Sequence, residues 1–156
     1  MGKNNQLDGH ILNIIQNNII EEQSDLQKHL EERGFEIPQA TLSRRLKKLN
    51  IAKVSGEYKI IDYNQPYLPL ILNMKVSDLG LIILHTHPGN ANSLGYFFDQ
   101  KYVSYSPKEK KDSVILGTIA GDDTVLIIVK SKGDLKKAIS LIQQDFPYLH
   151  FASDNQ

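Results

Sequence analysis

The sequence predicts a mixed α/β (α+β) protein with two small domains. The first consists of three short helices and a hairpin, and the second has the element order ββαββα. Apolar residues recur at helical spacing over the first 50 residues. Short apolar runs separated by turn residues follow them, and a proline-containing segment divides the chain. We therefore place domains at 1–62 and 70–145, with a linker at 63–69 and a tail at 146–156.

Length and composition agree with two small domains. The chain has 156 residues, of which 40% are hydrophobic, and it contains no cysteine. The absence of cysteine excludes a disulfide framework, a thiolate zinc site and a thiol nucleophile. No apolar run approaches the ~20 residues of a membrane helix, and the N-terminus is polar rather than signal-like. We expect a cytoplasmic protein with no membrane partner.

The first helices are predicted from periodicity and capping signals. In residues 7–20, helical spacing connects five apolar positions: Leu7, Ile11, Ile14, Ile15 and Ile19. A capping box follows, in which Ser24 and Gln27 satisfy orphan amides at the start of a second helix. Leu26 and Leu30 form its buried stripe, and Gly34 suits the left-handed position that ends it.

A third helix and a hairpin complete the first domain. Pro38 suits the first turn of a helix, with Leu42, Leu46 and Leu49 facing inward. Two short runs, 51–54 and 58–61, then enclose a turn of Ser, Gly and Glu. Three short helices followed by such a hairpin are the layout of a winged helix-turn-helix domain.

The second domain alternates strands and helices. Strands are predicted at 70–76, 79–86, 114–120 and 124–130, and helices at 90–100 and 133–144. Leu94, Phe97 and Phe98 form the buried side of the first helix, and the polar segment 101–113 is predicted as a loop. This order favours helices on one face of a mostly antiparallel sheet.

The zero net charge hides a strongly uneven distribution. Residues 1–38 carry three basic and seven acidic side chains, whereas residues 39–59 carry six basic and one acidic. Binding to phosphates depends on local potential, so the basic segment is a candidate DNA-binding surface. The alternative is an ordinary solvated helix face. The position of the third helix, after a capped helix and before a hairpin, favours the DNA interpretation.

Polar side chains on the third helix fit base and phosphate recognition. Gln and Arg make bidentate bonds to base edges, Thr adds a methyl group for thymine, and Ser and Lys hold phosphates. Lysines on the hairpin would add contacts to the DNA backbone. The candidate DNA-binding residues are Gln39, Thr41, Ser43, Arg44, Lys47 and Lys53.

Two adjacent carboxylates, Asp122 and Asp123, follow Gly121 between the last two predicted strands. Like charges side by side are unfavourable unless something neutralises them. The pair is therefore a candidate site for a cation, a guanidinium or an amine. The alternative is that these residues simply make a good hairpin turn.

Alternating histidines raise the hypothesis of an enzyme. His85 and His87 would point to the same face of a strand, and imidazole is a good zinc ligand. His-x-His-Pro also opens the metal motif of JAB/MPN-type metalloproteases, but the positions of its serine and third ligand are here Gly95 and Phe98. We therefore expect no metal site and no catalytic residues, and interpret the histidines as strand residues near a subunit contact.

Four segments together resemble the bacterial arginine repressors. They are QATLSR at 39–44, KVSGEYK at 53–59, THPGNA at 86–91 and LGTIAGDDT at 116–124. The matches occur in the right order and cover most of residues 7–145. The resemblance implies an arginine-responsive transcription regulator, not an enzyme. Such regulators assemble as hexamers of two stacked trimers and bind double-stranded operator DNA of arginine biosynthesis and catabolism genes.

The resemblance also assigns a ligand site in residues 70–145, where L-arginine acts as corepressor between the trimers. Asp122 and Asp123 would lie at the ligand, with one carboxylate taking the guanidinium from across the interface, and Asp99 would face the α-amino end. Thr118 and Ala120 would line the site. Asn92 stands where the family usually has Gln, which is one methylene longer.

Two other features bear on this assignment. The segment between Asp99 and Gly117 is longer than usual in the family, which adds a polar loop near the ligand.

Some family members assist site-specific DNA recombination as architectural factors. That function remains an alternative, because the same DNA-binding domain serves both.

Overall fold

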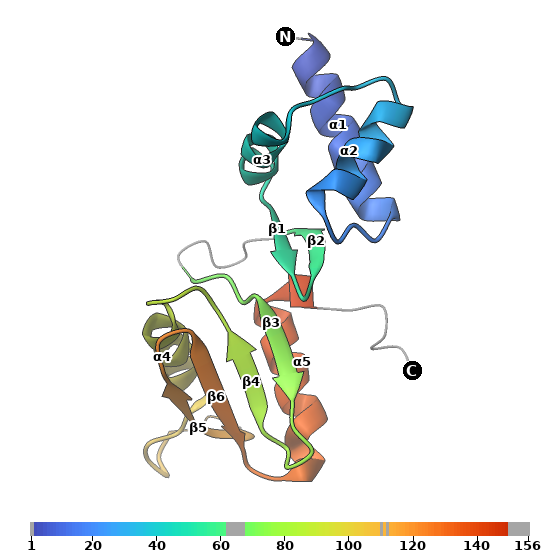
Figure 1. Cartoon of the computed structure of the whole chain (residues 1–156). Helices are drawn as coiled ribbons and strands as arrows, with labels where there is room; N and C mark the ends of the chain where they lie inside the picture. The colour runs from blue at the N-terminus through green and yellow to red at the C-terminus, as the bar shows by residue number, and fades with distance from the viewer. Residues whose placement is uncertain (1, 62–67, 110, 112, 150–156) are drawn as a thin grey trace. The chain divides into compact units, whose positions relative to one another are not determined.

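The computed structural model describes residues 2–61, 68–109, 111 and 113–149 (Figure 1). The chain divides into two compact units, residues 1–62 and 63–156. Most of the predicted linker 63–69 and of the predicted tail 146–156 lies outside the described residues. Within the described residues, no helix combines the length and apolar character that crossing a bilayer requires.

The first unit contains three helices and a two-stranded hairpin. The elements are α1 (Gly2–Asn17), α2 (Gln23–Glu32), α3 (Gln39–Lys48), β1 (Ile51–Val54) and β2 (Glu57–Ile60). One apolar cluster joins all three helices to the hairpin. Its buried members are Leu7, Ile11, Ile14, Ile15, Ile20, Leu26, Leu30, Leu42, Leu46 and Ile51. The predicted layout of three helices and a hairpin is confirmed.

Two details of the helix predictions are wrong. Helix α1 ends at Asn17, so Ile19 leaves the periodic stripe and is 73% exposed, while Ile20 is buried in its place. The capping box does not form, because α2 begins at Gln23 with Glu22 as its N-cap, and Gln27 Nε2 donates to the carbonyl of Ile37 at 2.9 Å. A tertiary partner therefore takes the side chain that local spacing assigned to the helix start.

The hairpin has the geometry that its short turn demands. Ser55 and Gly56, the two central residues, have φ values of +53° and +81°, which is the combination that a type I′ hairpin turn requires. The strands pair in antiparallel register from Ile51 with Ile60 to Val54 with Glu57. Tyr58 N also donates to Ile20 O at 2.8 Å, which ties the hairpin to the connection between α1 and α2.

The second unit is a four-stranded antiparallel sheet with two helices against one face (Figure 1). The strands β3 (Asn73–Val76), β4 (Ile82–His85), β5 (Ile115–Ala120) and β6 (Thr124–Val129) lie in the order β3-β4-β6-β5. The helices are α4 (Ala91–Tyr102) and α5 (Leu135–Asp145), with short 3-10 turns at Lys132–Asp134 and Pro147–Leu149. The predicted order ββαββα is confirmed.

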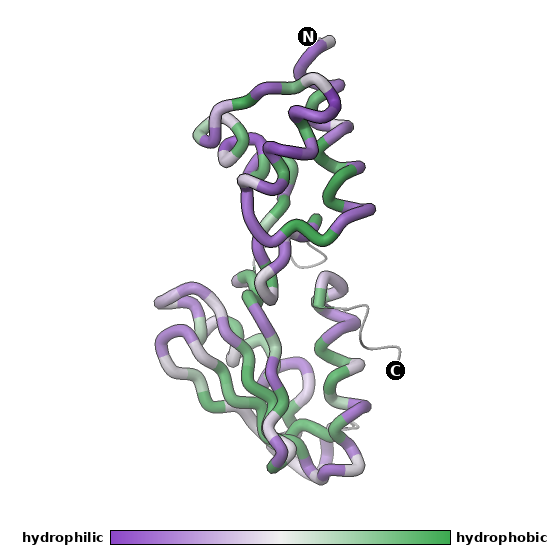
Figure 2. Tube along the Cα trace, turned by 45° about the vertical axis from the view of Figure 1, so that its right-hand side comes forward, coloured by the Kyte–Doolittle hydropathy of each residue, from purple (hydrophilic) through white to green (hydrophobic). Residues whose placement is uncertain are grey.

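Aromatic and polar contacts hold α4 against the end of α5. The rings of Phe98 and Phe146 lie 5.8 Å apart. Tyr102 Oη and Lys101 Nζ both donate to the carboxylate of Asp145, whose side chain is 6% exposed. Figure 2 shows hydrophobic residues along the strands, and hydrophobic residues alternating with hydrophilic ones along α5. Helix α4 is therefore fixed at its C-terminal end by the packing of the core.

Candidate functional site

Helix α3 presents a basic surface opposite its buried side. Leu42 and Leu46 point into the core, and with about 3.6 residues per turn Arg44 lies on the opposite side of the helix. Arg44, Lys47 and Lys48 are all exposed, and α3 contains no acidic residue. We call these three the basic face of α3. Its charge and its donors suit contacts to phosphates and base edges.

Two neighbouring arginines of α3 have different surroundings. Arg45 Nη1 lies 3.2 Å from both carboxylate oxygens of Asp8 on α1, and the two side chains are 16% and 14% exposed. Arg44 is exposed to solvent. Arg45 therefore fastens α3 to α1, whereas Arg44 is available to a ligand.

The other predicted DNA-binding residues of α3 are less uniform. Gln39 is exposed at the first residue of the helix, and Thr41 is half-buried. Ser43 is also half-buried, and its hydroxyl donates to Gln23 Oε1 on α2 at 2.9 Å. The structure thus brings Arg44 and Lys47 to the basic face and gives Ser43 a partner within the protein.

Lys53 on β1 is the predicted contact from the hairpin. Its Nζ lies 3.1 Å from Glu22 Oε1, with the two side chains 40% and 67% exposed. Such an exposed pair contributes little to stability. Lys53 Nζ also lies 5.8 Å from the ring centroid of Tyr58. The ammonium group of Lys53 therefore lies near both the Glu22 carboxylate and the ring of Tyr58.

In the second unit, residues of α4 and β5 line an open pocket of about 210 Å³. Its lining combines a carboxylate, an amide, a hydroxyl and an aromatic ring with two small residues. The lining residues are Asn92, Gly95, Tyr96, Asp99, Thr118 and Ala120. Four of them are predicted ligand residues, and the structure brings these four together. Sequence reasoning missed Gly95 and Tyr96, although they lie on α4 between Asn92 and Asp99.

Gly95 allows the helix to approach the strand closely. A Cβ at this position would lie 3.2 Å from Ala120 Cβ and 3.3 Å from Thr118 Oγ1, which is tighter than most van der Waals contacts in folded proteins. The Thr118 hydroxyl can therefore donate to Asp99 Oδ1 at 2.9 Å. The pocket presents an oriented carboxylate, which suits an ammonium or a guanidinium group.

The Asp122–Asp123 pair lies beyond the pocket, in the turn that follows β5. Both side chains are exposed. Asp122 Oδ1 accepts from Gly89 N at 3.0 Å, and the Asp122 carbonyl accepts from Ala91 N at 3.2 Å. Asp123 Oδ1 accepts from the Thr124 hydroxyl at 2.9 Å. The turn therefore supports the start of α4 and directs two carboxylates to solvent, outside the lining of the pocket.

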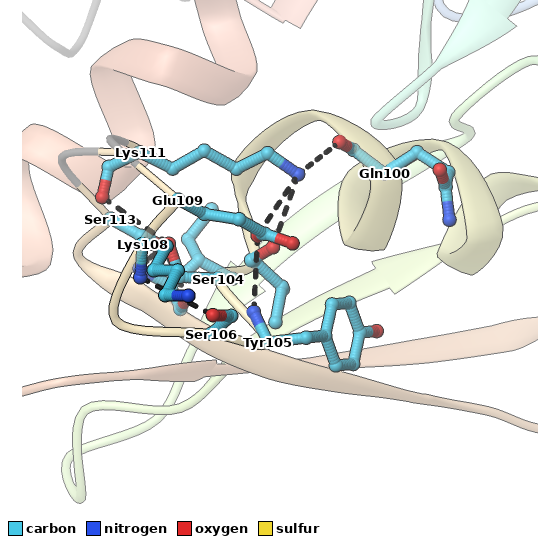
Figure 3. Close-up of polar contacts among 10 residues, drawn as sticks. Gln100, Ser104, Tyr105, Ser106, Lys108, Glu109, Lys111 and Ser113 are labelled. Carbon is cyan, nitrogen blue, oxygen red and sulfur yellow. Dashed lines mark hydrogen bonds and ion pairs between the residues drawn. The ribbon is translucent and has the colours of Figure 1, made fainter.

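The long segment between α4 and β5 closes the C-terminal end of α4 (Figure 3). Lys111 Nζ donates to the carbonyls of Gln100 and Val103 at 2.7 and 3.2 Å and lies 3.8 Å from a carboxylate oxygen of Glu109. Glu109 Oε2 in turn accepts from Tyr105 N at 3.2 Å. None of the described residues of this segment lines the pocket. The described residues of this segment therefore contact the C-terminal end of α4 rather than the pocket itself.

The predicted alternation of two histidines on one strand is wrong. Strand β4 ends at His85, so His87 lies in the turn that follows. His85 Nδ1 hydrogen-bonds with the Asn73 side chain on the paired strand β3. In the part of the chain that the structure describes, no three His, Asp or Glu residues gather to hold a metal ion.

Comparisons with known proteins cover both units. A family model described as arginine repressor, DNA binding domain, matches residues 2–66, and one described as arginine repressor, C-terminal domain, matches residues 70–144. An arginine repressor of Parabacteroides distasonis is 37% identical over 150 residues, which cover 90% of this chain and 95% of that protein. One from Geobacillus stearothermophilus is 36% identical over 140 residues (81% and 88%), and one from Chlorobium limicola 38% over 132 (79% and 83%).

Proposed function

Because this chain belongs to the arginine repressor family, and is thus a DNA-binding transcriptional regulator, we propose that it controls genes of arginine biosynthesis and catabolism. It acts as a hexamer, a dimer of trimers, with L-arginine as corepressor. The observation that carries this proposal is the pocket of α4 and β5, in which the Asp99 carboxylate is oriented by Thr118.

In this proposal, DNA binding belongs to α3 and the hairpin. Arg44 reads a base edge, because its guanidinium is exposed opposite the buried side of the helix. Lys47 and Lys53 contact phosphates, so their contribution falls as salt concentration rises. Gln39 and Thr41 add base contacts at the start of the helix. Ser43 reaches a phosphate only by exchanging its hydrogen bond to Gln23.

L-arginine is bound through both of its cationic ends. The Asp99 carboxylate takes the α-ammonium group, with Asn92 and Thr118 beside it. The guanidinium leaves the pocket and meets Asp122 or Asp123 of a neighbouring subunit. A planar guanidinium matches the two oxygens of a carboxylate. A ligand shared between subunits stabilises the assembled state by mass action.

The surface of β5 supports assembly. This strand is an edge of the described sheet, and it exposes Leu116 and Ile119 at 57% and 61%. Exposed apolar residues on an edge strand favour burial against another chain. Assembly in turn brings several α3 helices into one particle, and their spacing decides whether paired half-sites are engaged together.

The test measures operator binding and oligomer size in parallel at fixed salt. Fluorescence anisotropy of a labelled palindromic arginine-operator duplex is compared with that of a scrambled duplex, with no amino acid, L-arginine or D-arginine. Sedimentation velocity follows the oligomer under the same conditions. We expect L-arginine alone to tighten specific binding and to favour the hexamer. If L-arginine changes neither operator affinity nor oligomer size, the proposed corepressor is wrong.

A further inference from the structure

We propose that Tyr96 is a ligand-binding residue of the pocket and that its ring covers the face of the guanidinium group of L-arginine. This inference rests on the proposed function, because it takes L-arginine as the ligand. It assigns a recognition element that neither the motif residues nor the acidic turn supplies.

Packing of the core does not account for the position of Tyr96. Its side chain is 66% exposed on α4. The neighbouring aromatic residues pack together in one cluster: Phe97, Phe98, Tyr102, Phe146 and Tyr148. Among the described residues, Tyr96 has no ring contact, hydrogen bond or ion pair. A large aromatic side chain is thus held at the pocket with an uncovered ring.

Helix geometry places this ring between the two polar groups of the pocket. Asn92, Tyr96 and Asp99 follow one another at spacings of four and three residues, so they lie along the same side of α4. All three line the pocket. The ring of Tyr96 therefore lies within one helical turn of Asp99 on the side that lines the pocket, where a ligand held by the Asp99 carboxylate can reach it.

The chemistry of a guanidinium requires more than carboxylates. Its five N–H donors lie in one plane, where the oxygens of an aspartate can accept them. The two faces of that plane remain without a partner. An aromatic ring stacks on such a face and attracts the positive charge. Tyr96 therefore complements the Asp122–Asp123 turn, because the ring takes a face and the carboxylates take the edge.

This role predicts a specific effect on selectivity. L-citrulline has nearly the shape of L-arginine, but its ureido group is neutral. Tyr96→Leu keeps an apolar side chain at the rim and removes the aromatic face, whereas Tyr96→Phe keeps both. Tyr105→Leu is the matched control, because Tyr105 is 69% exposed and lies outside the pocket.

Calorimetric titration of the full chain with L-arginine, and competition with L-citrulline, tests the inference. We expect Tyr96→Leu to weaken L-arginine binding by about threefold to thirtyfold, with a much smaller change for L-citrulline. Tyr96→Phe and Tyr105→Leu should retain the affinity of the unmodified chain. The thermal midpoint should also be retained, because the replaced ring is exposed.

The outcomes separate this inference from the proposed function. If the unmodified chain does not bind L-arginine, both the proposed corepressor and this inference are wrong. If it binds and Tyr96→Leu leaves the ratio of L-arginine to L-citrulline affinity unchanged, only the role of Tyr96 is wrong. A Tyr96→Leu variant that changes oligomer size in the absence of ligand would also overturn it, since the ring would then be a subunit contact.

Discussion

Replacing the adjacent arginines of α3 one at a time separates DNA contact from fold stability. Arg44→Ala removes an exposed guanidinium from the basic face. Arg45→Ala removes a guanidinium that binds both oxygens of Asp8. The two changes delete the same group one residue apart, so a difference in their effects depends on the surroundings that the fold creates.

The magnitudes follow from burial and partners. Arg45→Ala leaves the Asp8 carboxylate, which is 14% exposed, without its two hydrogen bonds. Losing a charged partner at such a site costs about 1–3 kcal/mol, a fall of roughly 5–20 °C in the thermal midpoint of a small domain. Arg44→Ala should change stability by less than about 0.5 kcal/mol. It should weaken operator binding by about 1–3 kcal/mol, or roughly 5- to 150-fold.

Thermal unfolding followed by circular dichroism measures the change in stability. Anisotropy of the operator duplex, at a temperature well below the thermal midpoint, measures the change in DNA affinity. Asp8→Ala and the Asp8→Ala/Arg45→Ala double variant complete a cycle, and the two changes should be strongly non-additive. If Arg44→Ala lowers the midpoint as much as Arg45→Ala, Arg44 is not the free side chain that the fold indicates. If Arg45→Ala reduces affinity more than Arg44→Ala while the domain is folded, Arg44 is not the principal DNA contact of the two.

Three further changes test the second unit. Asp122→Asn should remove the effect of L-arginine on DNA affinity and leave binding without L-arginine intact. The amide oxygen still accepts from Gly89 N, and operator anisotropy with and without L-arginine checks this. Lys111→Met should lower the free energy of unfolding in urea by about 0.5–1.5 kcal/mol, because it removes a cation from the carbonyl end of α4. Burial, followed by the hydrogen bond and charge of Asp145, raises the pKa of Tyr102. Its stabilising contribution is therefore full below about pH 10 and is lost as pH rises through the folded pKa. Tyr102→Phe should reduce the alkaline fall in the thermal midpoint.

The elements of the fold are predictable because their signals are local. Apolar spacing identifies α1 to α3, and Gly56 between two short apolar runs identifies the hairpin, because glycine adopts the positive φ that the turn requires. The errors occur where a distant group competes. Gln27 bonds to Ile37 instead of its own helix start, and the end of α1 at Asn17 moves Ile19 out of the buried stripe. Spacing along one helix contains no information about such partners.

The site is predictable only where its residues belong to a motif or to one face of an element. The family resemblance assigns Asp99 and Thr118 to the site, and the structure adds the hydrogen bond between them. The partner of Ser43 on α2 lies 20 residues away in the sequence, so no local pattern indicates it. No sequence motif includes Tyr96. An exposed aromatic residue on a helix indicates a binding role only when the pocket beside it is known.

In the proposed hexamer, strand β5 connects the bound ligand to the contact between subunits. Side chains alternate along a strand, so Thr118 and Ala120 face the pocket while Ile119 is exposed on the other side. Gly95 lets α4 rest directly on the pocket side of this strand. A ligand that binds Asp99 therefore restrains the backbone that also carries the exposed apolar side chain. Allosteric coupling requires two sites that bias one common element. In the proposed hexamer, β5 is that element, because any change in its position reaches the pocket and the subunit contact together.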